Sequence, residues 1–332
     1  MTKPVTRISV IVPMLNEADH IEALVAALGA QDWDGGLEVL VADGGSTDGS
    51  RELLTSAARA EDLELELLDN PAGWVSAGLN ACIRKASGDL IVRVDCHSRY
   101  PSDYLSACAR AAEETGAWNV GGLVVAEGRT QPERAVACAM DSPFGGIGWT
   151  RHGASTLRSE VDTVTYGAFR PEAFERAGDF DESLGRNQDD ELNLRLRRAG
   201  GTIVLDPSIR TYYVPRGSLP KVFRQYFEYG LWKVPVMLRH RRVLSARSLA
   251  PLAFVLSLLV LAPAAVFLPA ARWLLLLEVV AYLAGALVFA AQSVKRRGES
   301  WRLLPRVVGT FGAFHVGYGL GMLAGWARAP FG

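Results

Sequence analysis

The sequence predicts an α/β domain with a mostly parallel sheet, followed by a membrane part made of apolar helices. Between residues 7 and 94, short β-rich runs alternate with helical patterns at the spacing of βαβ units. From residue 249 to residue 294, only Arg272 and Glu278 are charged. Charge also separates along the chain, because residues 249–332 carry a formal net charge of +5 and residues 1–248 one of −6. A chain of 332 residues is long enough for both parts.

The composition excludes several classes of protein. A hydrophobic fraction of 49% and a charged fraction of 21% are typical of a folded chain, not of a disordered one. No basic stripe dominates the first part, so we expect no nucleic-acid partner. The four cysteines share no CxxC spacing, which predicts buried, reduced thiols. No apolar signal-peptide core follows the first residues, so we expect the first part to stay in the cytosol.

The α/β part is predicted element by element from its pattern. Residues 7–12 form an unbroken β-rich run, as expected for a strand buried on both faces. A helix follows, because apolar residues recur at spacings of three and four over residues 21–28. The pattern continues with a strand over 37–42, a turn over 43–49, a helix over 50–60, a strand over 63–68, a helix over 74–86 and a strand over 90–94.

Polar residues follow three of these strands. Residues 13–17 follow the first strand, residues 43–45 the second and residues 95–97 the fourth. Ligands of open α/β sheets bind at the carboxyl ends of the strands, so the three segments together indicate a nucleotide site. No GxGxxG follows the first strand and no GxxxxGK[ST] occurs anywhere, which argues against a dinucleotide oxidoreductase and a P-loop NTPase.

Three apolar runs predict three transmembrane helices, at about 249–268, 273–292 and 307–326. The third run contains a GxxxG at Gly317 and Gly321, which suits close packing of helices in lipid. Arginines precede the first run and basic residues fill the 293–306 loop, whereas the first link has only Arg272. The positive-inside rule then places the first part and this loop in the cytoplasm and the C-terminus outside.

Residues 219–242 mix aromatic and apolar side chains with lysines and arginines. This composition fits a helix in the lipid headgroup layer, and it fits a surface helix packed on the first part equally well. We therefore expect a cytosolic domain over 1–218, an amphipathic interfacial segment over 219–247 and a membrane domain over 248–332.

The first part resembles glycosyltransferase family 2 over roughly residues 7–235. The resemblance rests on Val-Pro-Met-Leu-Asn-Glu at 12–17, Val-Ala-Asp-Gly-Gly-Ser-Thr-Asp-Gly at 41–49, the segment from Gly167 to Glu182, and Gln-Asp-Asp-Glu-Leu at 188–192. Within the family it looks most similar to ExoA-like enzymes of exopolysaccharide (succinoglycan) biosynthesis, through residues 93–101, 161–167, 186–193 and 224–233. The resemblance implies a GT-A (Rossmann-like) fold, a nucleotide-diphospho-sugar donor and inversion at the sugar carbon.

Asp95 and His97 resemble the DxD metal motif of the family, with histidine in the last place. Residues i and i+2 of an extended segment point to the same side, so the two side chains can share one divalent cation. Such a cation neutralises the departing diphosphate. Mn²⁺ and Mg²⁺ are both candidates, and the imidazole favours Mn²⁺.

The resemblance implies that Asp43 accepts a hydrogen bond from the base of the donor. It also implies that Pro13, Asn16 and Glu17 line the base and ribose. We expect Asn80 to order this wall and Asp95 to contact the donor. The alternative for Asp43 is an ordinary turn residue.

Inversion needs a general base that deprotonates the acceptor hydroxyl. The family's Glu-Asp motif implies Asp189 as this base, with Gln188 at the usual glutamate and Asp190 as the fallback. The acids at 189–191 also fit a solvated helix start, because carboxylates favour a helix N-terminus.

Two further segments have candidate roles. Gln225 and Trp232 look like an altered form of the family's QxxRW motif, which in relatives closes over donor and acceptor. Arg151 and His152 lie in a glycine-rich stretch, where contact with the diphosphate or acceptor competes with an ordinary solvated loop.

The sequence therefore predicts a metal-dependent inverting glycosyltransferase at the cytoplasmic (inner) membrane. We expect it to move a sugar from a UDP-hexose, such as UDP-glucose, to a polyprenyl-diphosphate-linked glycan, with other polysaccharide-assembly proteins as partners. Two alternatives stay open: a polyprenyl-phosphate glycosyltransferase, and a non-catalytic, membrane-anchored scaffold that binds nucleotide sugars.

Overall fold

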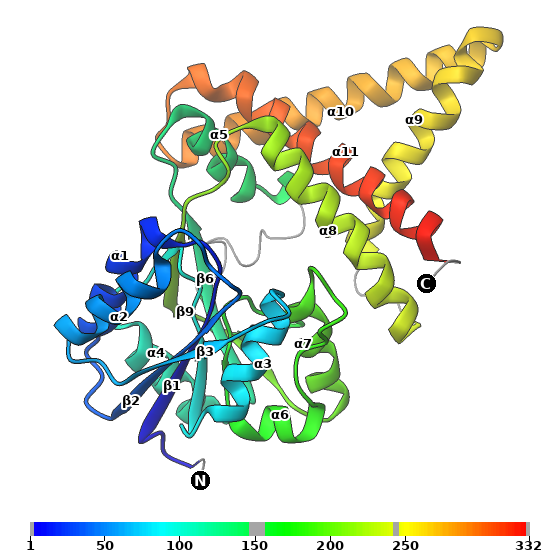
Figure 1. Ribbon diagram of the computed structural model, residues 1–332. Coiled ribbons are helices and arrows are strands. Elements are labelled where there is room, and N and C mark those ends of the chain that lie inside the picture. The colour runs from blue at the N-terminus through cyan, green and yellow to red at the C-terminus, as the bar shows by residue number, and fades with distance from the viewer. Residues whose placement is uncertain (1–2, 146–156, 242–245, 330–332) are drawn as a thin grey trace. The chain divides into compact units, whose positions relative to one another are not determined.

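The computed structural model describes residues 3–145, 157–241 and 246–329 (Figure 1). The chain divides into two compact units. The first unit comprises residues 1–125 and 155–213, and the second comprises residues 126–154 and 214–332. The described residues 126–145 therefore belong to the same unit as the C-terminal helices.

Four parallel strands form one half of the sheet in the first unit, in the order β3-β2-β1-β4. Each follows a β-rich run of the sequence, and a helix connects each strand to the next, as predicted. The strands are β1 (Arg7–Met14), β2 (Gly36–Asp43), β3 (Leu65–Asp69) and β4 (Leu90–Arg93), and the helices are α1 (Ala18–Gly29), α2 (Ser50–Ala60) and α3 (Val75–Lys85).

Antiparallel pairs complete the sheet, which is therefore mixed. The order continues from β4 through β8 (Ala168–Phe169), β6 (Asn119–Ala126), β9 (Ile203–Tyr213) and β5 (Ser98–Arg99), and β7 (Ser159–Glu160) pairs with β9. Three of these strands have only two residues, too short to show a pattern in the sequence. The parallel half of the sheet was predictable from the sequence pattern. The antiparallel half depends on pairing between strands that are distant in the chain.

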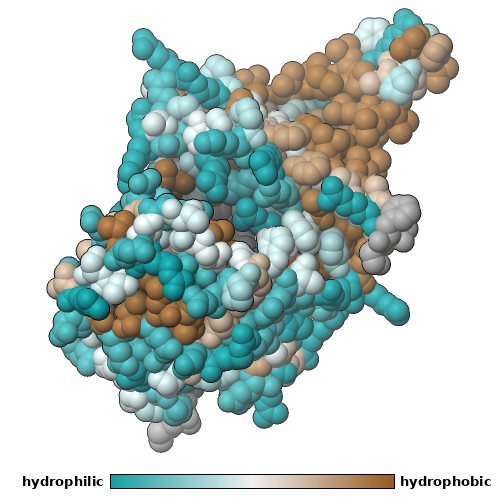
Figure 2. Space-filling model, viewed as in Figure 1, coloured by the Kyte–Doolittle hydropathy of each residue, from teal (hydrophilic) through white to brown (hydrophobic). Residues whose placement is uncertain are grey.

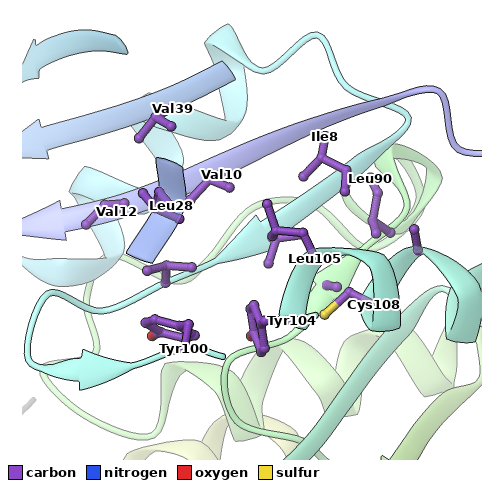
Figure 3. Close-up of a cluster of buried hydrophobic side chains, with 14 of the residues drawn as sticks. Ile8, Val10, Val12, Leu28, Val39, Leu90, Tyr100, Tyr104, Leu105 and Cys108 are labelled. Carbon is purple, nitrogen blue, oxygen red and sulfur yellow. The ribbon is translucent and has the colours of Figure 1, made fainter. Parts of the chain in front are cut away.

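Buried side chains pack on both faces of this sheet, because successive residues of a strand point to opposite sides. Val10 and Val12 of β1 face one cluster, and Ile11 between them faces the other. In Figure 3, Ile8, Val10 and Val12 lie near side chains of α4 (Tyr104–Thr115). The second cluster includes side chains of α3, α6 (Pro171–Ala177) and α7 (Gln188–Arg198). Cys82, Cys96, Cys108 and Cys138 are all free and buried, as the sequence predicts.

The second unit is helical. It contains α5 (Gln131–Met140), α8 (Leu219–His240), α9 (Ala250–Phe267), α10 (Pro269–Arg296) and α11 (Leu304–Arg328), with short 3-10 turns at Pro143–Gly145, Ala246–Leu249 and Trp301–Leu303. The sequence predicted α5 as part of the domain over 1–218 and α8 as part of the segment over 219–247. The structure places both helices in the second unit. Ala135 and Val136 of α5 lie in one buried cluster with Val307, Phe311 and Phe314 of α11.

Three helical segments are long and apolar enough to cross a membrane: Arg247–Phe267, Pro269–Arg296 and Trp301–Arg328. They overlap the three apolar runs of the sequence, and they indicate a membrane protein. Figure 2 shows hydrophobic side chains gathered over α9 and α10. Within this hairpin, Ser257 of α9 donates a hydrogen bond to Glu278 of α10.

Candidate glycosyl-transfer site

The carboxyl ends of β1, β2 and β3 lie at one edge of the parallel sheet. Met14 pairs with Asp43, and Asp43 pairs with Asp69. Side chains connect the loops that follow: the backbone N–H of Asn16 donates to Ser46 Oγ at 2.8 Å, and Asn16 Oδ1 accepts from the backbone N–H of Thr47 at 2.9 Å. Asn16, which the sequence predicted to line the base and ribose, therefore lies in one of two loops that are bonded to each other.

The segment between β2 and α2, together with the first residue of α2, also holds Glu17 and the start of α1. The Glu17 amide N–H donates to Ser50 Oγ at 2.9 Å, and the Ala18 N–H donates to Asp48 Oδ2 at 3.0 Å. Pro13 accepts a contact from the Cys96 thiol at 3.8 Å through its carbonyl oxygen. This contact brings the loop after β1 beside the segment after β4.

Asp43 is buried and already bonded within the protein. Its carboxylate accepts from the Ser46 hydroxyl at 2.5 Å and from Arg51 Nη1 at 2.8 Å. Burial alone would raise the pKa of Asp43, but these hydrogen bonds outweigh burial and lower it. The side chain is thus ionised and fixed. A bond to a donor base, which stays a prediction, would share an oxygen with Ser46 or Arg51.

Asn80 links α3 to the segment around residue 180. Its Nδ2 donates to the Phe180 carbonyl at 2.9 Å and to Glu182 at 2.8 Å, and its Oδ1 accepts from the Phe180 N–H at 2.9 Å. Both ends of the amide are therefore used inside the protein. A contribution of Asn80 to donor binding would act through the 180–182 segment.

Arg93, at the end of β4, joins two of the predicted site residues. Its Nη1 donates to Asp189 Oδ1 at 2.6 Å, and its Nε donates to Asp95 Oδ1 at 3.2 Å. Arg93 is only 5% exposed, and its guanidinium lies 5.9 Å from the centre of the Tyr166 ring. The structure thus brings the predicted base and the predicted metal ligand together on one buried cation.

Asp189 lies in the first turn of α7, together with Asp190 and Glu191. Burial raises the pKa of Asp189, and the neighbouring carboxylates of Asp95 and Asp190 raise it further, while Arg93 opposes both. A carboxylate with a raised pKa is a stronger base, which suits the predicted role.

The other two acids of this turn are engaged elsewhere. Asp190 accepts from Thr163 Oγ1 at 2.9 Å, and Thr163 accepts in turn from Asn193 Nδ2 at 2.8 Å. Glu191 is buried and pairs with Arg195 at 2.8 Å. Of the three acids, Asp189 is the one held by the buried arginine beside Asp95.

Asp95 and His97 follow β4, as the sequence predicts. They do not belong to a larger group of potential metal ligands among the described residues. The described residues contain no group of three or more His, Cys, Asp or Glu side chains that could hold a metal ion. His97 is 39% exposed, and its Nδ1 lies 3.2 Å from Glu17 Oε1. One carboxylate and one exposed imidazole fit a divalent cation that takes its other ligands from substrate phosphates and water.

Two predicted residues lie in the second unit, on α8. Gln225 Nε2 donates to the Tyr229 hydroxyl at 3.0 Å, and Trp232 lies partly exposed two turns further along. Their roles at the donor and acceptor stay predictions. Arg151 and His152 lie outside the described residues.

Sequence reasoning gave no role to Arg93 and missed the conformation of Tyr166. Tyr166 has φ of 54°, in the left-handed region that a bulky side chain seldom adopts. Its hydroxyl accepts from Ser98 Oγ at 3.3 Å. The signal for Arg93 was present, because an arginine ends the otherwise apolar run Leu90-Ile91-Val92. A buried cation needs a buried partner, and the partner came from a distant segment.

Comparison with known proteins identifies the family of the chain. The family model for glycosyl transferase family 2 matches residues 9–168. The succinoglycan biosynthesis protein ExoA of Rhizobium meliloti (strain 1021) is 36% identical over 246 residues, which cover 74% of each chain. The undecaprenyl-phosphate 4-deoxy-4-formamido-L-arabinose transferase of Yersinia pestis (strain Pestoides F) is 30% identical over 144 residues, 42% of this chain and 43% of that protein.

A solved structure shares the fold. The mannosyltransferase PcManGT from Pyrobaculum calidifontis, in complex with GDP-Man and Mn²⁺, aligns with a TM-score of 0.65 at 21% identity, over 94% of this chain and 88% of that one. At this identity the likeness establishes the GT-A fold. The family model and the ExoA relative show that the chain belongs to glycosyltransferase family 2.

Proposed function

We propose that this protein is an inverting glycosyltransferase that builds a cell-surface polysaccharide or exopolysaccharide on a lipid carrier. The donor is a nucleotide-diphospho-sugar, most simply a UDP-hexose such as UDP-glucose. The acceptor is a hydroxyl of a polyprenyl-diphosphate-linked glycan. The observation that carries this proposal is the position of Asp189, which lies 2.6 Å from Arg93, while Arg93 also holds Asp95.

The chemistry needs one base and one stabilised leaving group. Asp189 accepts the proton of the acceptor hydroxyl while that oxygen attacks the anomeric carbon. The bond from that carbon to the donor diphosphate breaks, and the nucleoside diphosphate leaves with the electron pair. Attack from the face opposite the leaving group converts an α-linked donor into a β-glycoside.

Asp95 and His97 would hold a divalent cation, which supplies charge neutralisation for the departing diphosphate. Arg93 keeps the two carboxylates in place around this position, since it bonds to both and is itself buried. Four residues would contact the base and ribose, because they lie at the carboxyl ends of β1 and β2 or directly after β1: Pro13, Asn16, Glu17 and Asp43.

Three observations support a lipid-linked acceptor at the cytoplasmic membrane. The chain has apolar helices of membrane-spanning length. The ExoA relative is named for succinoglycan biosynthesis and the Yersinia relative for transfer to undecaprenyl-phosphate. Basic residues border α9 and follow α10, which favours the cytoplasmic face for the first unit.

The Yersinia relative favours a second candidate, transfer directly to a polyprenyl phosphate. The two candidates differ in their need for a base. A phosphate monoester is already largely ionised at neutral pH, whereas a sugar hydroxyl is not. A polyprenyl-phosphate acceptor would therefore leave substantial activity in Asp189→Asn, and a glycan hydroxyl would not.

The deciding experiment is nucleotide release by the purified full-length protein in lipid. UDP-sugars are tested with Mn²⁺ or Mg²⁺ and a lipid extract as acceptor, with EDTA and Asp189→Asn as controls. We expect metal-dependent UDP release with one preferred sugar, lost in both controls. If no UDP-sugar gave UDP release, the UDP-sugar donor would be rejected. GDP-sugars would then be tested in the same assay.

A further inference from the structure

The helices α11 and α8 pack side by side with their backbones in close contact. A Cβ atom added at Gly317 or Gly325 of α11 would lie 2.8 Å from a backbone oxygen of α8, and one at Gly321 would lie nearer still. Small residues permit such an approach. The contacts pair Gly317 with Phe223, Gly321 with Phe227 and Gly325 with Leu231. Since the residue numbers rise together, the two helices run in the same direction, side by side.

The partner helix α8 is too polar to cross a bilayer. Its 22 residues include Lys221, Arg224, Glu228, Lys233 and Arg239. The Arg224 side chain is 82% exposed and pairs with Glu228 at 3.2 Å on the surface of the helix. Charged side chains inside the hydrocarbon are costly, whereas a mixed aromatic and basic helix is stable in the headgroup layer. A helix that follows α8 over most of its length lies at the same depth.

The first half of α11 is covered by a second polar helix. Val307, Phe311 and Phe314 pack against α5, whose ends are tied to the basic segment around α11. Arg306 donates to Gln131 at 2.6 Å at one end, and Arg297 pairs with Asp141 at the other. This leaves residues 316–328, about 13 residues, whereas a span needs roughly 20.

The hairpin α9–α10 differs from α11 in exposure. Half of the apolar window of α11 is buried inside the protein, but only 11% of the windows of α9 and α10 is buried. Phe267, at the hairpin tip, is 81% exposed and Trp273 is 71% exposed. Arg272 satisfies the carbonyls that end α9, donating to Ala265 at 2.6 Å and to Val266 at 3.0 Å. Residues 250–267 and 269–285 each give about 17 to 18 residues, enough to span.

We propose that α8 and α11 form a paired platform in the headgroup layer of the cytoplasmic leaflet. Among the described residues, the α9–α10 hairpin alone crosses the bilayer. The chain then ends on the same side as it begins, in contrast to the three crossings expected from hydropathy. Exposed Trp301 and Arg302, at the start of this platform, are side chains suited to the boundary between lipid and water. The proposal does not depend on the identity of donor or acceptor.

The test compares the sides of two introduced cysteines in the full-length protein. Lys295→Cys reports the end of α10, and Arg328→Cys reports the end of α11. Both positions are exposed. The four native cysteines are buried, so labelling by a membrane-impermeant maleimide reports the new thiol. Each variant is labelled in right-side-out and in inside-out membrane vesicles.

We expect both cysteines to react in the same vesicle orientation. Reaction in opposite orientations means that α11 crosses the membrane and overturns the proposal. Fusions at the C-terminus give a second readout that needs no reactive thiol. A fluorescent GFP fusion supports the platform, and a dark GFP fusion with an active alkaline phosphatase fusion contradicts it.

Discussion

The guanidinium of Arg93 lies 2.6 Å from the carboxylate of Asp189, although 96 positions separate the two residues in the chain. The same guanidinium contacts Asp95 at 3.2 Å. One buried arginine thus sets the distance between the proposed base and the proposed metal ligand.

Replacement of Asp189 by asparagine should abolish transfer to a hydroxyl acceptor and leave nucleotide binding intact. The amide keeps the size of the side chain but cannot accept the proton, so the rate should fall by roughly 10²- to 10⁴-fold. UDP release and UDP binding by calorimetry measure the two properties. Asp190→Asn is the matched control, because Asp190 bonds to Thr163 instead. A larger loss in Asp190→Asn would move the base to that residue.

Removal of Arg93 should harm both stability and activity. Arg93→Ala leaves Asp189 and Asp95 partly buried without their shared cation, and breaking such a pair costs about 3–5 kcal/mol. Arg93→Lys keeps the charge but cannot reach both carboxylates with a planar fork, so we expect a near-normal Tm and a lower kcat. Thermal unfolding and UDP release separate the two effects. The exposed Arg110→Ala serves as control, and an equal loss there would refute a specific role for Arg93.

Substitution of His97 should change the preferred metal. Imidazole tolerates Mn²⁺ better than Mg²⁺, and a carboxylate favours Mg²⁺. His97→Asp should therefore lower the ratio of activity with Mn²⁺ to activity with Mg²⁺, and Asp95→Asn should lower activity with both. His20→Asp, on the neighbouring helix, is the control. An unchanged metal ratio in His97→Asp would remove His97 from the proposed site.

The stabilisation provided by Asp43 should depend on pH. Hydrogen bonds from Ser46 and Arg51 hold the pKa of Asp43 below its ordinary value of 3.8, so folding favours the ionised form. This stabilisation is present above that value and is lost as the pH falls through the lower pKa of the folded state. The Tm difference between wild type and Asp43→Asn should thus be constant from pH 5 to pH 8, and narrow below about pH 4. A gap that stays constant down to pH 3 would contradict the lowered pKa.

Two glycines of α11 should respond in opposite ways to alanine. At Gly321 an added methyl group would collide with the backbone of α8 at Phe227, so Gly321→Ala should destabilise the membrane unit by about 1–3 kcal/mol. At Gly312 nothing lies within 4 Å, so Gly312→Ala should stabilise the helix by up to about 1 kcal/mol. Tryptophan fluorescence during thermal unfolding in detergent measures both. If both substitutions changed the free energy of unfolding by the same amount, α8 and α11 would not be packed together in detergent solution.

The sequence alone determined the local elements and the kinds of chemistry. Buried parallel strands appear as unbroken apolar runs, and Asp43, Asp95 and Asp189 fall in motifs whose residue types suit nucleotide and metal chemistry. The helices α9 and α10 were predictable because lipid requires long apolar runs, which hydropathy detects directly.

Tertiary structure decided which groups meet. Hydropathy reads composition along one helix, so it could not reveal that half of the apolar window of α11 is buried inside the protein. Strands of two residues carry no pattern, so the antiparallel half of the sheet was invisible. The partner of Arg93 was likewise undetermined, because contacts between distant segments depend on how the chain packs and not on local periodicity.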